Sequence, residues 1–464
     1  MEVLQRTANR GSISDGGYDI NHSCKFEPDN SEAFNTTNQA AGNRKTWTFS
    51  AWVKRSELGS LQTIFGAGDV FIRFDTPDVI QTYAGGYVTT NRKFRDTSAW
   101  YHIVWLLDTT QSTASNRSRL YVNGVQETSF SGAAYPDQNA DLDLGGQGAS
   151  SNWIQVGRWY AGGRLFSGYM AEVHYVNGTV AEPTAFGEFD EDSGIWKPKK
   201  YTGGGYGTQG FYYKFDDSSS MGKDSSGEGH NANSVENIAA ADQATDTPTN
   251  NFATLNTISA TSTVLHARDG ATILTNNDTS NTWQVISATI GVTSGKWYWE
   301  TQKNSATGNV LSGIAADDDP ALTTAALLGQ TSEGASIAFQ YNNNSIANGS
   351  GSFTMVSGQT MMFALDMDNG ALYFGKNGTW QNSSDPTSGS SKTGASALWS
   401  SFNNKIVLPA IEVYTGHQIL TNFGGYAPYA ISSAASDGDG YGTFEYAPPT
   451  GYYALCTKNL AEYG

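Results

Sequence analysis

Positive charge is scarce in this chain of 464 residues. Lysine and arginine together number 27, against 44 aspartates and glutamates, so the formal net charge at pH 7 is −17. Binding to nucleic acid depends on cationic side chains that neutralise phosphates, and docking on an anionic membrane surface needs the same charge. We therefore expect neither nucleic acid nor a membrane surface as a partner.

Cysteine is also rare, and long apolar runs are missing. Cys24 and Cys456 stand near opposite ends of the sequence, so no disulfide framework is predicted, and a bridge between them would require the termini to meet. The densest apolar cluster, at 103–107, is far shorter than a membrane span. The N-terminal MEVLQRTANRGS has no basic stretch followed by an apolar run, so we expect assembly in a cytoplasm without membrane insertion.

Aromatic residues and glycine are abundant instead. Aromatics make up 12% of the chain and glycines number 52, a combination that favours short strands joined by tight turns. The length predicts two or three domains, each able to bury a full core. We predict an all-β fold.

Apolar–polar alternation predicts strands through the first 200 residues. The segments 47–54 and 168–175 alternate with period 2, and the more continuously apolar 100–107 fits a central strand. Within 119–126, the dipeptide Asn123-Gly124 is the strongest short hairpin signal, because both turn positions need positive φ.

These segments carry a family resemblance. Taken in order, FSAWV, WYHIV, LYVNG and GYMAEVHY resemble the laminin-G-like branch of the concanavalin A-like jelly rolls. For 16–200 the resemblance implies two packed antiparallel sheets, with Glu172 and Tyr175 at the usual acidic and aromatic positions of the closing strand. Residues 1–15 carry no strand pattern and are expected to form an arm or virion attachment segment, with a frayed terminus as the alternative.

A second β unit is predicted at 256–428. GKWYWE, GIA, LDMDNG followed by LYFGKNG, LPAI and NFG occur in an order that resembles the SPRY domain. The Ala- and Leu-rich stretch 317–332 departs from the family and leaves room for a short helix. The fold prediction is therefore two antiparallel jelly-roll β-sandwiches in tandem.

The segments beside the second unit have a different composition. We predict that 201–255 is a strand at 210–216 plus a Gly/Ser/Asp-rich linker. We expect 429–464 to be an extended tail packed back on the second sandwich, because its Pro-Pro pair does not fit a central strand. The stretches 246–253 and 444–460 resemble structural proteins of marine phage virions, which implies a virion surface location, virion protein partners and assembly in the host cytoplasm.

Catalysis would require two carboxylates flanking one bond. Glu188-Phe-Asp190-Glu-Asp192 is the nearest match, but the alternation of acids expected on one strand face is interrupted at the third acid. The segment also follows the last predicted sandwich strand, so a solvated acidic loop is favoured. No nucleophile, metalloprotease or nucleotide-binding motif is present. We predict that the chain is not an enzyme, with a polysaccharide-degrading enzyme or its accessory carbohydrate-binding module as an alternative.

Calcium is the one cofactor that the sequence suggests, because relatives of the first sandwich often bind it on a rim. Two carboxylate clusters offer the hard oxygen ligands that calcium prefers. These candidates are Asp317, Asp318, Asp319, Asp437 and Asp439.

Glycan binding would use exposed aromatic platforms beside amides and carboxylates, since sugars offer apolar faces rimmed by hydroxyls. Several aromatic residues of the first sandwich stand near Gly-rich loops; core or sheet-face packing is the alternative role for each. The candidates are Tyr83, Tyr87, Trp153, Trp159 and Tyr160.

The sequence thus predicts a non-catalytic phage virion surface protein, a tail or head fibre or adhesin, that contacts host-surface polysaccharide. We expect a homo-oligomer, and a trimer if it is a fibre. The main alternative is a capsid decoration protein that binds other virion proteins. An intracellular SPRY adaptor that binds peptides is disfavoured by the laminin-G-like partner domain.

Overall fold

The computed structural model describes residues 17–37, 42–142, 153–159, 163–258, 265–277, 282–304, 308–323, 327–330, 335–398 and 400–464. The chain divides into two compact units, an N-terminal unit of Gly11–Thr249 and a C-terminal unit that contains Asn250–Gly464. Both are built from sheets that are almost entirely antiparallel, so the all-β prediction is confirmed. Within the described ranges, no helix has the length and apolar character needed to cross a membrane.

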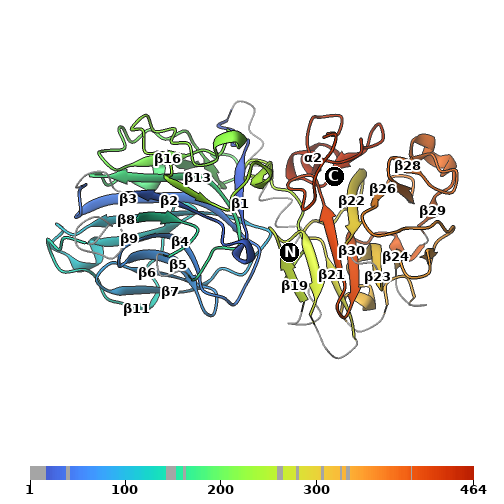
Figure 1. Cartoon of the computed structure of the whole chain (residues 1–464), viewed down its shortest axis with the longest axis horizontal. Helices are drawn as coiled ribbons and strands as arrows, with labels where there is room; N and C mark the ends of the chain where they lie inside the picture. Colours follow the sequence, from blue (N-terminus) through green and yellow to red (C-terminus); the bar gives the residue numbers. More distant parts are fainter. Residues whose placement is uncertain are drawn as a thin grey trace. The chain divides into compact units, whose positions relative to one another are not determined.

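Two eight-stranded sheets form the N-terminal unit (Figure 1). The strands of the first, sheet A, are β1 (Ser23–Phe26), β3 (Thr46–Arg55), β8 (Trp100–Asp108), β9 (Ser118–Val122), β10 (Val125–Gln126), β13 (Gly168–Asn177), β16 (Phe211–Tyr213) and β18 (Gln243–Ala244). They are ordered β10-β9-β8-β3-β13-β1-β18, and β16 pairs with β13.

The strands of the second, sheet B, are β2 (Ala33–Thr37), β4 (Gln62–Ala67), β5 (Val70–Asp75), β6 (Val79–Tyr83), β7 (Tyr87–Lys93), β11 (Phe130–Ala133), β12 (Trp153–Val156) and β17 (Ser234–Glu236). Their order is β11-β7-β6-β5-β4-β12-β2-β17. A separate hairpin pairs β14 (Gly187–Phe189) with β15 (Trp196–Pro198).

Period-2 alternation places one face of each sheet in a shared apolar core. Phe49 of β3 stacks on Phe65 of β4 with ring centroids 4.6 Å apart, so the core joins the two sheets. The predicted hairpin is confirmed: Asn123 and Gly124 have φ of 50° and 76° and connect β9 to β10.

Residues 201–249 are part of the N-terminal unit and not a linker, which corrects the predicted boundary at 200. Their strands β16, β17 and β18 pair with β13, β2 and β1. The polar composition serves turns: the Asp224 carboxylate accepts hydrogen bonds from the backbone N–H groups of Tyr212, Ser226 and His230. The predicted arm at 1–15 lies outside the described residues.

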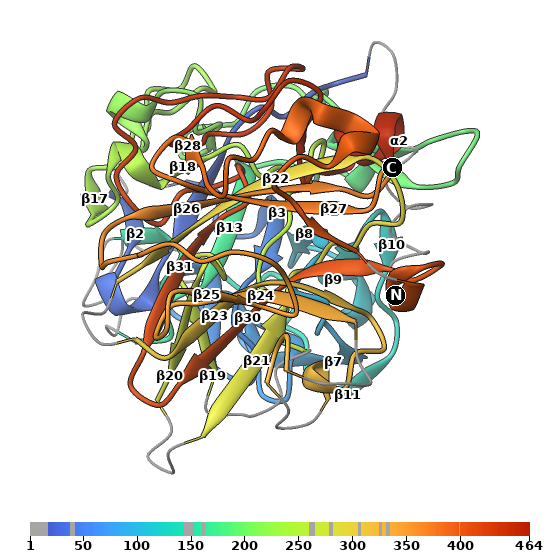
Figure 2. The same ribbon diagram turned by 90° about the vertical axis from the view of Figure 1, so that its right-hand side faces the viewer.

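The C-terminal unit has a nine-stranded and a five-stranded sheet (Figure 2). The larger contains β19 (Leu265–Arg268), β20 (Ile273–Asn276), β22 (Lys296–Lys303), β26 (Thr360–Asp366), β27 (Ala371–Lys376), β28 (Thr379–Trp380), β29 (Ser396–Ala397), β31 (Gln418–Asn422) and β32 (Tyr453–Ala454). The smaller contains β21 (Trp283–Ser287), β23 (Val310–Ala316), β24 (Ser336–Gln340), β25 (Ser345–Ala347) and β30 (Val407–Tyr414). Each SPRY-like segment of the sequence lies on or beside one of these strands.

Short 3-10 helices connect many of the strands in both units. They are η1 (Pro28–Asn30), η2 (Ala114–Asn116), η3 (Pro183–Ala185), η4 (Ser218–Ser220), η5 (Ala240–Asp242), η6 (Pro320–Leu322), η7 (Pro386–Ser391) and η8 (Ser400–Phe402). The turn η6 lies in the stretch where the sequence left room for a short helix.

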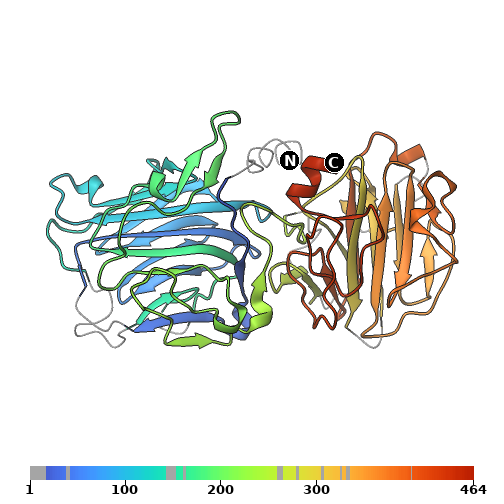
Figure 3. The ribbon, with the colours of Figure 1, turned by 90° about the horizontal axis from the view of Figure 1, so that it is seen from above.

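The segment 429–464 packs against the sheets of the C-terminal unit, to which it belongs. Its strand β32 pairs in parallel with β22, and it ends in the helix α2 (Thr457–Tyr463), drawn in red in Figure 3. Leu460 and Tyr463 of α2 pack on the core of this unit. Cys24 and Cys456 are free, buried thiols, and burial raises the pKa of both.

Candidate functional site

The outer face of sheet B, directed away from the core, carries the candidate site. On β5 the alternation is clear: Val70, Ile72 and Phe74 belong to the core cluster, so Phe71 and Arg73 face outward. Directly paired residues of neighbouring strands share a face. The outward position of Phe71 therefore identifies the other residues on this face.

Four aromatic side chains gather on this face; we call Phe71, Tyr83, Tyr87 and Trp159 the aromatic row. Phe71 pairs with Tyr83 across β5 and β6, and Tyr83 pairs with Tyr87 across β6 and β7. Ring centroids are 5.6 Å apart for Phe71–Tyr83, 4.7 Å for Tyr83–Tyr87 and 5.5 Å for Phe71–Trp159. The row thus spans neighbouring strands as a continuous ring surface.

Gly66 of β4 makes room for the last member of the row. A Cβ at this position would lie 3.2 Å from Cδ1 of Trp159, so a side chain here would press on the indole. The Trp159 Nε1–H group donates to the carbonyl oxygen of Gly68 at 3.0 Å, and the Arg164 guanidinium lies 4.6 Å from the indole ring. These contacts hold the indole over Gly66.

A chain of polar side chains runs beside the aromatic row, one pair further along the strands. Arg73 Nη2 donates to Gln81 Oε1 at 2.6 Å and to Asp75 Oδ2 at 3.1 Å. Gln81 Nε2 in turn donates to Thr89 Oγ1 at 3.0 Å. Gln81 and Thr89 are half-buried, so amide and hydroxyl groups border the rings.

A second polar group lies on the other side of Gly66. Gln155 Nε2 donates to Asn35 Oδ1 at 2.5 Å, and Asn35 and Arg158 both bond to the Glu236 carboxylate. Within the described protein, Gln155 Oε1 and Arg73 Nε are buried without a hydrogen-bond partner. Native proteins usually satisfy such atoms, so this face has hydrogen-bonding capacity that its own residues do not use.

The members of the aromatic row differ in solvent exposure. Phe71 is only 3% exposed, Tyr83 and Trp159 are half-buried, and Tyr87 is 49% exposed. A supported ring surface with amides and hydroxyls at its border matches the two sides of a sugar, whose C–H faces pack on rings and whose hydroxyls need hydrogen bonds.

Three of the five predicted platform residues, Tyr83, Tyr87 and Trp159, come together in the row. Trp153 lies two residues before Gln155 on β12, on the same outer face and half-buried, while Tyr160 lies outside the described residues. Sequence reasoning missed Phe71, whose place in the alternating VFIRFD segment is the signal that would have identified it.

The acidic segment after the last predicted sandwich strand forms the turn of the β14–β15 hairpin. Asp190 accepts hydrogen bonds from the backbone and hydroxyl of Ser193 and pairs with Lys197 at 3.2 Å. These bonds, the Ser193 backbone bond foremost, lower the pKa of Asp190 to about 2. Glu188 also faces Lys197, at 3.8 Å, so these acids hold a turn.

Three of the calcium candidates, Asp318, Asp319 and Asp437, make side-chain contacts within the protein. Asp318 pairs with Lys405, and Asp319 caps η6 by accepting the Ala321 N–H at 2.8 Å. Asp437 accepts four N–H bonds, including that of Asp439. The part of the chain that the structure describes contains no group of three or more His, Cys, Asp or Glu residues able to hold a metal ion. Calcium binding stays a prediction, with Asp317 still unassigned.

Comparison with known proteins agrees with this fold. Residues 28–184 match the family described as the concanavalin A-like lectin/glucanases superfamily, which confirms the predicted fold of the first sandwich. A search of curated protein sequences gives no match.

Three examples illustrate the similarity of this chain to solved structures. The SPRY domain of human HERC1 is 17% identical, with a TM-score of 0.27, and the match covers 36% of this chain and 96% of that one. A human SPRY domain is 15% identical, with a TM-score of 0.26 and coverage of 34% and 94%. A candidate carbohydrate-binding protein from Bacteroides ovatus is 19% identical, with a TM-score of 0.31 and coverage of 43% and 53%. The family match gives the N-terminal unit a concanavalin A-like, lectin-type fold. SPRY domains are among the structural neighbours of the chain.

Proposed function

We propose that the N-terminal unit binds polysaccharide on the outer face of sheet B. The observation that carries this proposal is the aromatic row, in which the exposed Tyr87 continues a ring surface supported by the buried Phe71. The amide and hydroxyl groups of Gln81 and Thr89 beside it suit sugar hydroxyls. A lectin-type fold supports the same ligand class.

For the whole chain, we propose a non-catalytic adhesin on the surface of a phage virion that contacts host-surface glycans. The lectin-type fold, the net charge of −17 and the virion-like stretches at 246–253 and 444–460 support this role. Other virion proteins would hold the chain in place, and a fibre would be a homo-oligomer, a trimer in the simplest case. A clean monomer in sedimentation would count against the fibre.

The test is binding of the purified full-length chain to polysaccharides extracted from a panel of aquatic bacteria, with polymer length followed in the same samples. Tyr87→Ala removes the exposed end of the aromatic row. Phe189→Ala is the matched control, because Phe189 is also 49% exposed but lies on the β14–β15 hairpin. We expect saturable binding that Tyr87→Ala weakens and Phe189→Ala leaves intact.

Each other outcome changes the proposal in a defined way. Equal losses in both variants would show that exposed aromatics bind non-specifically. Shortened polymers would overturn the non-catalytic role and favour a polysaccharide-degrading enzyme. No binding to any polysaccharide would overturn the adhesin and favour a capsid decoration whose partners are virion proteins.

A further inference from the structure

A lysine and two carboxylates meet beside the first strand of the N-terminal unit. Lys25 of β1 places Nζ 2.8 Å from Oδ1 of Asp242, at the end of η5. The same Nζ lies 3.0 and 3.1 Å from the two carboxylate oxygens of Glu32. The amine is therefore within contact distance of two carboxyl groups at once.

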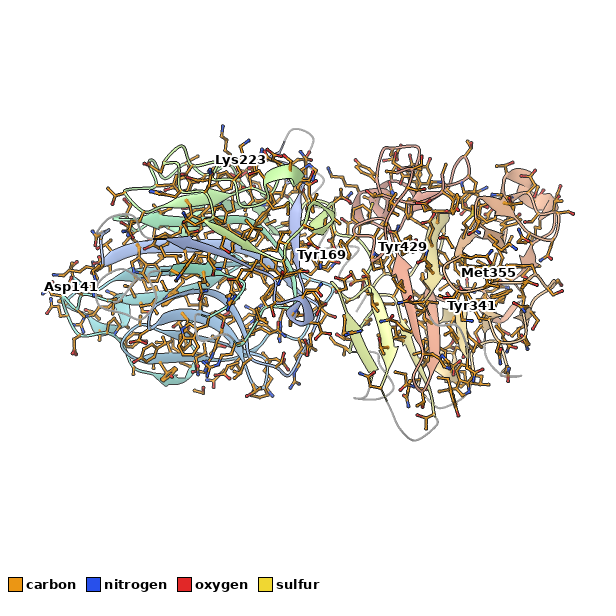
Figure 4. The ribbon with its side chains drawn as sticks, in the orientation of Figure 1. Asp141, Tyr169, Lys223, Tyr341, Met355 and Tyr429 are labelled. Carbon is orange, nitrogen blue, oxygen red and sulfur yellow. The ribbon has the colours of Figure 1, made fainter. Side chains whose placement is uncertain are left out.

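This cluster is almost fully shielded from water. Lys25 is 1% exposed, Glu32 2% and Asp242 6%. On the sheet, Lys25 pairs with Tyr169 of β13, which is labelled in Figure 4. Removing an ammonium and a carboxylate from water is costly, so burial favours proton transfer from Lys25 to Glu32.

The two carboxyl groups are held by their surroundings. Asp242 Oδ2 accepts the backbone N–H of Ala239 at 2.7 Å, which holds the carboxyl group in place while Oδ1 contacts the amine. Glu32 Oε2 accepts the backbone N–H of Glu27 at 2.7 Å, and Oε1 accepts Asn30 Nδ2 at 3.1 Å. Lys25 therefore faces two fixed partners rather than mobile surface groups.

We propose that Lys25 and Asp242 become joined by an intramolecular amide bond in the folded chain, with Glu32 as the proton carrier. Glu32 first takes a proton from the Lys25 ammonium, and the resulting neutral Nζ attacks Cγ of the Asp242 carboxyl group to form a tetrahedral intermediate. The departing oxygen then takes one proton from the nitrogen and the stored proton from Glu32, and it leaves as water. The C–N bond forms, the C–O bond breaks and one water molecule leaves, so no oxidant, reductant or cofactor is needed.

Two physical effects favour the reaction. Well-oriented groups in one molecule react with effective concentrations that reach about 10⁵ M or more. Exclusion of water from the cluster also opposes hydrolysis of the product. Burial raises the pKa of Glu32 to about 7, although the positive charge of Lys25 acts in the opposite direction. This value suits proton exchange near neutral pH.

The bond would covalently link β1, the first strand of the unit, to η5, which directly precedes its last strand, β18. A pulling force that enters at β1 and leaves after Asp242 would then pass through covalent bonds rather than through the sandwich. This consequence suits the adhesin proposed above, but the bond itself does not depend on glycan binding.

The intact mass of the denatured full-length chain tests the proposal. We expect the wild-type chain to be lighter than its sequence mass by one water molecule, and a protease digest to contain one branched peptide joining Lys25 to Asp242. Glu32→Gln and Asp242→Ala should restore the full sequence mass. Asp242→Asn should give the same branched peptide, because ammonia then leaves in place of water, and a purely ionic role would not produce it.

A second buried pair in the same chain serves as the internal comparison. Lys54 Nζ lies 2.6 Å from Asp246 Oδ2, while the Trp100 indole N–H donates to Asp246 Oδ1 at 3.1 Å and stabilises the ionised carboxylate. We expect this pair to stay ionic in the same digest. A wild-type mass equal to the sequence mass, or a branch at Glu32 instead of Asp242, would overturn the proposal without recourse to any variant.

Discussion

Tyr83 lies nearly parallel to Phe71, with ring centroids 5.6 Å apart and an interplanar angle of 19°. Phe71 is buried and cannot turn away, so it fixes the plane of the half-exposed Tyr83 ring. A ligand that packs on Tyr83 therefore meets a ring that is already oriented, and little conformational entropy is lost on binding.

Tyr83→Ala should weaken polysaccharide binding by about tenfold, or about 1.4 kcal/mol, because it removes the middle ring of the aromatic row. Titration calorimetry with the best-binding polysaccharide measures the change. Thermal unfolding of the same variant checks that the unit remains folded. An affinity equal to that of the wild type would exclude the aromatic row as the binding surface.

Gly66→Ala should also weaken binding, although it adds only a methyl group. The new Cβ would crowd Trp159 at 3.2 Å and displace the indole from the row. Gly132→Ala is the matched control, because Gly132 lies on the same sheet with no atom within 4 Å of its Cβ position. We expect a loss of several-fold in affinity for the first variant and none for the second; equal affinities would show that Trp159 does not contact the ligand.

The sequence was informative where the physical signal is local. Period-2 alternation located β3 and β13, and the Asn-Gly dipeptide located the turn between β9 and β10. The pairing of β17 with β2 is not local, because about 200 residues separate the two strands. A Ser/Gly/Asp-rich segment that closes a sheet edge has the same composition as a linker, which is why 201–249 was assigned wrongly.

The site was predicted only in part for a similar reason. Tyr83 and Tyr87 stand beside glycines and drew attention as loop aromatics, whereas Phe71 lies in a run with Val70 and Ile72 that looks like core. The alternation within VFIRFD places this phenylalanine on the face opposite Val70 and Ile72, and the observed register then pairs it with Tyr83.

Acid should destabilise the N-terminal unit partly through His102. The indole N–H of Trp196 donates to its Nδ1 at 3.0 Å, so the ring is neutral and its Nε2–H donates to Ser50 Oγ at 2.9 Å. Burial, and to a lesser extent His174, lowers the pKa of His102 to about 3.

Because the folded pKa of His102 lies below the unfolded value of 6.5, this stabilisation is complete above pH 6.5 and is lost as the pH falls toward 3. We expect a loss of roughly 2–4 kcal/mol over that window. His102→Gln can keep both hydrogen bonds without titrating, so the unfolding free energy of this variant should fall less than that of the wild type as the pH is lowered. Parallel pH profiles of wild type and variant, from chemical denaturation, would refute this assignment.

Glu412 should make the C-terminal unit less stable as the pH rises, whereas His102 makes the N-terminal unit less stable as the pH falls. Its carboxyl group accepts the Leu328 N–H at 2.8 Å, and its strand neighbours are Leu311 and Val285. Burial among these residues raises the pKa of Glu412 to about 8.

A folded pKa above the unfolded value of 4.5 means that the contribution of Glu412 is complete below pH 4.5 and is lost as the pH rises through 8. Glu412→Gln retains an acceptor for Leu328 and should be more stable than the wild type at pH 8, by roughly 1–3 kcal/mol, with a smaller difference at pH 5. Chemical denaturation at both pH values measures this. A difference that does not change with pH would contradict it.

Asp437 should stabilise the C-terminal segment through hydrogen bonds rather than through a bound cation. Its Oδ1 accepts the N–H groups of Asp439 and Tyr441, and its Oδ2 accepts those of Ala454 and the Asn459 side chain, at 2.8–3.0 Å. Four N–H donors point their positive ends at the carboxylate from the directions that a cation would occupy.

Asp437→Asn should therefore destabilise the C-terminal unit by roughly 2–4 kcal/mol, because the new amide nitrogen replaces one acceptor oxygen and faces two donors. Limited proteolysis should cut the variant within 429–464 before the wild type. A chelator should leave the melting temperature of the wild type unchanged, since N–H groups already fill the positions around the carboxylate. A chelator-sensitive melting temperature that Asp437→Asn abolishes would instead establish Asp437 as a calcium ligand.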